Sequence, residues 1–222
     1  MTRIELECLA VPPFIDITPY VPEVDKKERI RTCVILGSFG KFHQQINAII
    51  DTLSAGGIRV LAPKRGPITD AEGFQLLATD NLIIDDLLTR YPQISWTKDH
   101  FSAVIERIFQ STIGQAGFVY IVNPKNVRAP DGKLHPNGYA GTMVAAEIGH
   151  AIACGKPIYA LEPLDECLDD NEIAWPIVWR GIAQDIKAYK PDEILSMVDS
   201  GSLDESDYFW CEGFGPCWQV TL

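Results

Sequence analysis

Phe118-Val-Tyr-Ile-Val122 is the stretch that decides the fold, because all of its residues are apolar and most are β-branched or aromatic. A run of this kind is typical of a central parallel strand that is covered on both faces. Asn123-Pro124 ends the run, since proline has no N–H to donate to a strand ladder. The sequence therefore predicts a buried strand over residues 118–122.

Apolar runs and helical spacings alternate on both sides of this strand. Further strands are predicted at residues 32–36, 58–62 and 158–161. Helices are predicted at residues 42–55, 96–114 and 142–154, the last with Thr142 as its N-cap, and a short one at 190–198. Residues 74–78 fit a strand and residues 81–91 fit a helix. This alternation predicts an α/β, doubly wound parallel sheet.

Length and composition fit a single domain. The chain has 222 residues, 46% of them hydrophobic, which is enough for one substantial core. We expect a core over about residues 32–163, an N-terminal arm over 1–31 lying across it, and an aromatic C-terminal extension over 164–222. The aromatic residues of this extension are expected to pack on the sheet edge or at a subunit interface: Trp175, Trp179, Tyr208, Phe209, Trp210, Phe214 and Trp218.

Charge and targeting signals narrow the class of partner. The formal net charge of −11 argues against binding to nucleic acid or to an anionic membrane, because both need basic patches. No apolar run approaches the roughly 20 residues of a membrane span. The first residues include acids where a signal peptide would be apolar. The six cysteines are scattered without a CxxC pair, so we expect reduced thiols in a cytoplasmic protein.

Three polar or glycine-rich segments follow the predicted strands. Gly37-Ser-Phe-Gly40 follows the first strand, Asn123 follows the central strand, and Asn137-Gly-Tyr-Ala-Gly141 leads into the helix that begins near Thr142. Ligands of open parallel sheets bind outside the carboxyl ends of the strands. We therefore expect the three segments to converge on one ligand site, where backbone N–H groups can hold a phosphate or a ribose.

Five motifs together resemble the nucleoside 2-deoxyribosyltransferase-like family over roughly residues 32–163. They are Gly37-Ser-Phe39, Tyr120-Ile-Val-Asn-Pro124, Gly138-Tyr-Ala-Gly141, Glu147-Ile-Gly-His-Ala151 and Gly155-Lys-Pro-Ile158. The resemblance implies a flavodoxin-like sheet of about five parallel strands with helices on both faces. It also implies transfer or hydrolysis of the N-glycosidic bond of a (deoxy)nucleoside or nucleoside monophosphate, without a cofactor or metal, by a homo-oligomer.

The resemblance also assigns roles to individual residues. Glu147 matches the family's nucleophile, which attacks the anomeric carbon and forms a glycosyl-enzyme ester. A carboxylate suits this step because the transition state resembles an oxocarbenium ion. Glu106, on the helix before the central strand, is the candidate for the second acid, which helps to protonate the leaving base. The candidates for substrate binding are Gly37, Ser38, Phe39, Asn123, Gly138, Tyr139, Gly141 and Thr142.

Departures from the family pattern leave a non-catalytic nucleotide- or nucleoside-binding module as the alternative. Gly117 stands where members often carry an acid just before the central strand. Gly141 stands where members place Asp or Ser, and the Thr142 hydroxyl is its candidate substitute. The spacing from Gly141-Thr142 to Glu147 disfavours the lysine-decarboxylase-like phosphoribohydrolases. A single Glu147-x-x-His150 pair disfavours a metal site.

Overall fold

The computed structural model describes residues 15–62, 67–69, 75–164 and 177–203. At its centre is a five-stranded sheet in the order β2-β1-β5-β8-β9, and every neighbouring pair in it is parallel. Taken in chain order these strands run 2-1-3-4-5, which is the flavodoxin-like order. The predicted α/β doubly wound fold is therefore confirmed. The strands are β1 (Thr32–Gly37), β2 (Arg59–Leu61), β5 (Phe118–Val122), β8 (Ile158–Ala160) and β9 (Lys187–Ala188).

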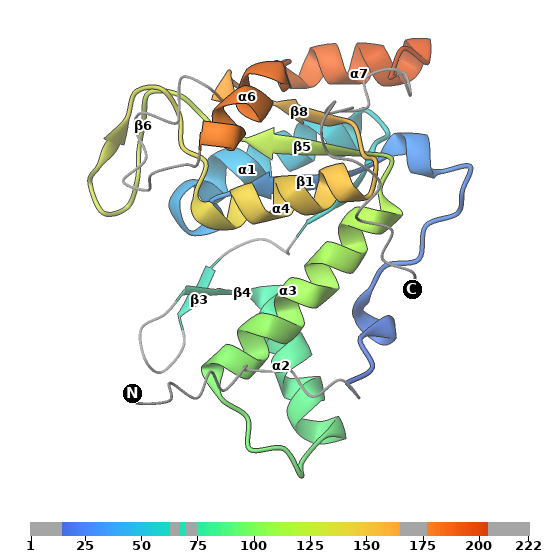
Figure 1. Ribbon diagram of the computed structural model, residues 1–222, viewed down its shortest axis with the longest axis vertical. Helices are drawn as coiled ribbons and strands as arrows, with labels where there is room; N and C mark the ends of the chain where they lie inside the picture. The colour runs from blue at the N-terminus through green and yellow to red at the C-terminus, as the bar shows by residue number, and fades with distance from the viewer. Residues whose placement is uncertain (1–14, 63–66, 70–74, 165–176, 204–222) are drawn as a thin grey trace, which may run out of the picture.

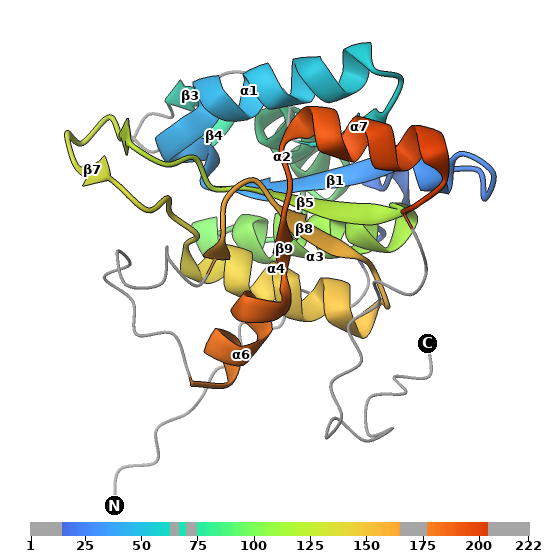
Figure 2. The same cartoon turned by 90° about the horizontal axis from the view of Figure 1, so that it is seen from above.

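Helices cover both faces of this sheet, as Figure 2 shows. On one face lie α1 (Phe39–Ala55) and α7 (Pro191–Ser200). On the other face lie α3 (Lys98–Gln115), α4 (Thr142–Ala153) and α6 (Ile177–Asp185). None of the helices in the described ranges combines the length and the apolarity that a membrane span requires.

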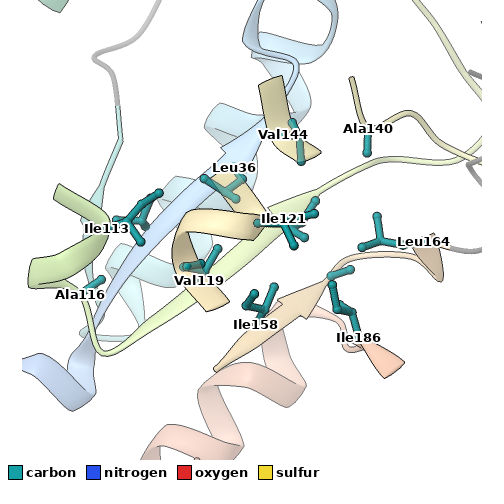
Figure 3. Close-up of a cluster of buried hydrophobic side chains, with 14 of the residues drawn as sticks. Leu36, Ile113, Ala116, Val119, Ile121, Ala140, Val144, Ile158, Leu164 and Ile186 are labelled. Atoms are coloured by element: carbon teal, nitrogen blue, oxygen red, sulfur yellow. The ribbon is translucent and has the colours of Figure 1, made fainter. Parts of the chain in front are cut away.

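The two core layers come from the alternation of side chains along the strands. All five residues of β5 are buried, and Val119 and Ile121 face the α3–α4 side together with Leu36 of β1 (Figure 3). Phe118 and Tyr120 of β5 face the α1–α7 side. Burying a large apolar side chain contributes roughly 1.5–3 kcal/mol. A strand that fills both layers therefore anchors the fold, as its sequence predicts.

A second, smaller cluster lies away from the sheet. The helix α2 (Ala78–Arg90) and the first half of α3 extend below the sheet in Figure 1. Ile15 of the N-terminal arm is buried in this cluster together with Leu87 of α2 and Val104 of α3. The described part of the arm includes two short 3-10 turns, η1 (Thr18–Tyr20) and η2 (Arg29–Arg31). The described part of the arm thus contacts both units: Ile15 packs in the peripheral cluster, and Val24 is buried in the core beneath the sheet.

Several element boundaries differ from the predictions. α1 begins at Phe39 rather than at residue 42, with a kink at Phe42 where φ is −130° and ψ is 29°. Gly141, not Thr142, is the N-cap of α4, because Gly141 has extended backbone angles while Thr142 is already helical. α3 begins at Lys98, because Thr97 and His100 form a capping box.

Two predicted segments have a different structural context. Residues 75–77 do form a strand, β4 (Gln75–Leu77), but β4 pairs antiparallel with β3 (Pro67–Thr69) outside the main sheet. The fifth sheet strand is β9, which lies in the C-terminal extension, so the sheet continues beyond the expected core limit of residue 163. The prediction that the aromatic residues of the extension pack on the sheet edge or at an interface falls outside what the structure describes. This applies to Trp175, Trp179, Tyr208, Phe209, Trp210, Phe214 and Trp218.

Candidate functional site

The site lies where the direction of the chain across the sheet reverses. β1 continues into α1 on one face, whereas β5 leads on to α4 on the other face. Open parallel sheets bind ligands at this switch point, outside the carboxyl ends of the strands. The last pair in the register of β1 and β5 is Gly37 with Val122. The segments after Gly37 and after Val122 therefore start side by side, as the sequence predicted.

Gly37 and Ser38 form a tight junction between β1 and α1. A Cβ atom on Gly37 would lie 2.9 Å from the carbonyl oxygen of Val122 and 3.2 Å from Cδ1 of Ile46. Ser38 is the N-cap of α1, but its hydroxyl makes no capping hydrogen bond. Its carbonyl instead accepts from the N–H groups of Lys41 and Phe42. The first turn of α1 therefore starts at the sheet edge without a side-chain cap.

Asn123 links the ends of two strands. Its side chain is fully buried, and its amide nitrogen donates to the carbonyl of Glu162 at 3.0 Å. Its amide oxygen accepts from the N–H of Glu162 at 3.1 Å. The carboxylate of Glu162, in turn, pairs with Lys190 and, at 3.6 Å, with Lys125. In this structure the Asn123 amide, a candidate for substrate binding, holds the segment after β8 beside the segment after β5.

The glycine turn before α4 packs directly on Asn123. Gly138 has a φ of 87°, in the left-handed region that favours glycine. A Cβ atom there would lie 2.5 Å from the carbonyl oxygen of Asn123. Gly141 caps α4 without a side chain, and its carbonyl accepts from Ala145 at 3.2 Å. The turn therefore approaches the end of β5 closely, and the side chain of Thr142 lies outside what the structure describes.

Tyr139 belongs to an aromatic group between this turn and α1. Its ring lies 4.9 Å from the ring of His135 and 6.3 Å from that of Phe42, both in edge contacts. The ammonium of Lys41 lies 4.6 Å from the centre of the Tyr139 ring and 3.6 Å from a carboxylate oxygen of Asp131. A cation over an aromatic face is an attractive arrangement. The contact joins α1 to the segment before α4.

His135 and Asp131 belong to a hairpin between β5 and α4. Its strands are β6 (Val127–Arg128) and β7 (Leu134–His135), which pair antiparallel. In the turn between them the Gly132 N–H donates to the Ala129 carbonyl at 2.9 Å. Lys41 and His135 were not among the predicted site residues, because their place beside Tyr139 depends on how this hairpin folds back toward α1.

Glu147 lies in an environment that favours its protonated form. Glu147 is partly buried on α4, and Glu106 lies on α3, which packs against α4. Burial, in the first place, and the negative charge of Glu106, in the second, together raise the pKa of Glu147 from 4.5 to about 8. Glu147 therefore favours its protonated form at neutral pH.

The core-facing side of α4 accounts for the partial burial of Glu147. Val144, Ile148 and Ala151 pack into the core beneath the sheet, and Glu147 lies next to this stripe along the helix. Glu147 is five residues beyond Thr142, so it stands about 7.5 Å along the helix axis from the carboxyl edge. Further along, His150 Nε2 lies 3.4 Å from Sγ of Cys154. In the described part of the chain no group of three or more His, Cys, Asp or Glu could hold a metal ion.

Sequence reasoning missed one polar contact of the acid pair. The side-chain amide of Gln110 donates to Oε1 of Glu106 at 2.9 Å, one turn along α3.

No known protein-family model and no curated protein matches the chain. The resemblance to the nucleoside 2-deoxyribosyltransferase-like family thus rests on its five sequence motifs.

Proposed function

We propose that the protein transfers or hydrolyses the N-glycosidic bond of a (deoxy)nucleoside or nucleoside monophosphate, with Glu147 as the nucleophile. One observation supports this proposal above the others. A partly buried carboxyl, Glu147, is coupled by charge to a second carboxyl, Glu106, near the switch point of a parallel sheet. Pairs of acids whose environments separate their proton affinities are common in glycosidic chemistry.

The charge state of the pair fits the requirements of the first step. In this proposal the reaction starts with a proton on Glu147, whose pKa is raised to about 8. Glu106 takes the proton from Glu147 and passes it to a ring nitrogen of the base. The bond between C1′ and the base breaks with its electron pair on the base, and a carboxylate oxygen of Glu147 bonds to C1′. The products are a neutral base, a neutral ester on Glu147 and a charged Glu106.

The second step restores the starting state. Glu106 accepts a proton from a water molecule or from the N–H of a second base. The oxygen or nitrogen thus activated attacks C1′, and the ester bond to Glu147 breaks. The proton on Glu106 returns to the pair. Water as acceptor gives hydrolysis, and a second base gives transfer, so both outcomes use the same two carboxyl groups.

The carboxyl edge supplies the remaining substrate contacts in this proposal. The backbone of Gly37 and Ser38, and the turn from Gly138 to Gly141, border the switch point. Gly37 and Gly138 lack side chains where the backbones approach most closely, and the uncapped first turn of α1 suits an anionic or hydroxyl group. Tyr139 offers an aromatic edge to a base, and Phe39 packs against the cluster beneath α1.

The test is a panel of nucleosides and nucleoside monophosphates, each with and without a free acceptor base, with released and exchanged base measured by chromatography. We expect turnover by the natural chain and none by Glu147→Gln, which keeps the shape of the protonated acid. We also expect the rate to fall as pH rises through about 8, because the pair then loses its only proton. Unchanged turnover in Glu147→Gln would rule out the nucleophile.

A binding module for the same ligands is the second candidate, and one contact favours it. Gly117 replaces an acid that the family often carries, and a Cβ atom at Gly117 would lie 2.0 Å from the carbonyl oxygen of Arg29 in the arm. No larger side chain fits there. A binding module predicts thermal stabilisation by the ligand with no base released by either the natural chain or Glu147→Gln.

We also infer that the protein acts in the cytoplasm as a homo-oligomer, without a cofactor, on a small molecule rather than on nucleic acid or a membrane. The homo-oligomer is what the resemblance to the nucleoside 2-deoxyribosyltransferase-like family implies. Light scattering of the purified protein tests the assembly. A monomer at working concentration would contradict this part of the proposal.

A further inference from the structure

Arg29 and Lys156 lie at the edge of the sheet where the strands begin. Arg29 comes shortly before β1, and Lys156 comes shortly before β8. β5 lies between these two strands and runs parallel to both. Because parallel strands begin at one common edge, both residues lie at the opposite edge from the candidate site, which is at the carboxyl ends of the strands.

Contacts bring both residues to the same short segment, which connects α3 to β5. Nη2 of Arg29 donates to Oε1 of Gln115 at 3.4 Å. Nζ of Lys156 donates to the carbonyl of Ala116 at 2.6 Å. A Cβ atom on Gly117 would lie 2.0 Å from the carbonyl oxygen of Arg29. The two cationic residues therefore converge on consecutive residues of one segment, and both of their side chains are partly buried there.

The guanidinium of Arg29 has more donors than the protein satisfies. A guanidinium has several N–H donors and no acceptor. Within the described residues, its hydrogen bond to the neutral amide of Gln115 is the one that the side chain makes. Its Nε is shielded from solvent and has no partner in the same part of the chain. Buried polar atoms are nearly always bonded, so an orphan donor on a cation points to an anionic partner.

The positive charge at this edge is only partly offset by the protein. In the described ranges neither Arg29 nor Lys156 forms an ion pair. Glu28, the acid beside Arg29 in the sequence, pairs with Arg59 at 3.4 Å. Burial, in the first place, and the charge of Arg29, in the second, lower the pKa of Lys156. The C-terminal ends of α3 and α4 each carry about half a negative charge, which balances about one of the two cations.

We propose that Arg29 and Lys156 form a binding site for a small phosphate-class oxyanion at this edge of the sheet. The planar fork of an arginine matches two oxygens of a phosphate, and a lysine adds a point charge. A phosphate bound there joins the residues before β1, the end of α3 and the residues before β8. The inference goes beyond the proposed function and does not rest on it, because it concerns the opposite edge of the sheet.

The experiment is a titration of the full chain with inorganic phosphate, at an ionic strength held constant with sodium chloride. Isothermal calorimetry gives the dissociation constant for the natural sequence, Arg29→Gln and Lys156→Gln. Arg31→Gln is the matched control, because Arg31 lies in the same 3-10 turn and pairs with Asp199 at 2.7 Å. The control removes the same charge from the same turn and leaves the proposed site intact.

We expect saturable binding of phosphate by the natural chain and by Arg31→Gln, with dissociation constants within about twofold of each other. Arg29→Gln and Lys156→Gln should each weaken binding roughly tenfold or more, since each removes a charged donor to the anion. Equal affinity in all four chains would overturn the proposal, because the phosphate would then bind elsewhere. A natural chain that shows no saturable binding would overturn it as well.

An NMR measurement keeps the test independent of how well the variants fold. In the natural chain, the Nε–H signal of Arg29 should shift along the same saturation curve as the calorimetric titration, whereas that of Arg31 should stay in place. A stationary Arg29 signal at saturating phosphate would overturn the proposal. Neither measurement depends on the release of a base, so failure of the proposed function leaves this inference standing, and its own failure leaves the proposed function standing.

Discussion

Replacing Glu147 with glutamine should make the protein more stable while it removes the nucleophile. Folded Glu147 keeps its proton up to about pH 8, whereas an unfolded glutamate loses it near 4.5. Between these values the folded state binds the extra proton, so stability falls as the pH rises, and above about pH 8 the loss is complete. At 1.36 kcal/mol per pH unit, the cost reaches about 3 kcal/mol at pH 7.

Glu147→Gln avoids this cost because the amide cannot ionise. We expect the variant to match the natural chain near pH 4 and to exceed it by about 3 kcal/mol at pH 7, roughly 6–12 °C in Tm. Urea unfolding from pH 4 to pH 9 measures the difference, with Glu23→Gln as the control, because Glu23 is exposed and should change stability by less than about 0.5 kcal/mol. A variant that is less stable at pH 7, or a difference that does not grow with pH, would refute the reasoning.

Three other changes should alter stability in urea unfolding. Gly138→Ala should lower the free energy of unfolding by about 2–4 kcal/mol, because the residue has a positive φ and its new Cβ would collide with the backbone of Asn123. Gly132→Ala is the control: Gly132 has a similar φ but open space around it, so the cost should be about 1 kcal/mol. Equal costs would contradict the steric explanation. Asn123→Ala should cost about 2–3 kcal/mol, since it leaves the partly buried N–H and carbonyl of Glu162 without their Asn123 partner. Thr97→Ala should lose the cap of α3 and about 1 kcal/mol, while Thr52→Ala in the last turn of α1 should stay within about 0.5 kcal/mol.

The main sheet could be predicted because each of its long elements carries its own signal. Phe118–Val122 is buried on both faces of the sheet, and its wholly apolar composition predicts this burial. β9 could not be predicted in this way. It has only two residues, Lys187 and Ala188, and they are a strand because Tyr159 and Ala160 of β8 pair with them. Such a strand is defined by its partner rather than by its own side chains.

The site was predictable in its location but not in its contacts. The convergence of the segments after Gly37 and Val122 follows from the rule for parallel sheets. The use of the Asn123 amide depends on where residue 162 returns to the sheet, which no local pattern specifies. The effect of Glu106 on Glu147 likewise depends on how two helices pack. Gln110 is one of many helical glutamines until its partner is known.

The helix α3 is shared by two separate packing units. Near Glu106, Val104 and Ile108 belong to the peripheral cluster with α2 and the arm, whereas Ile113, near the end of the helix, belongs to the core beneath the sheet. One acid of the pair is thus mounted on the sheet unit and the other on the peripheral unit. The placement of Glu106 therefore depends on the packing of α2 and the arm, whereas the placement of Glu147 depends on the packing of the sheet.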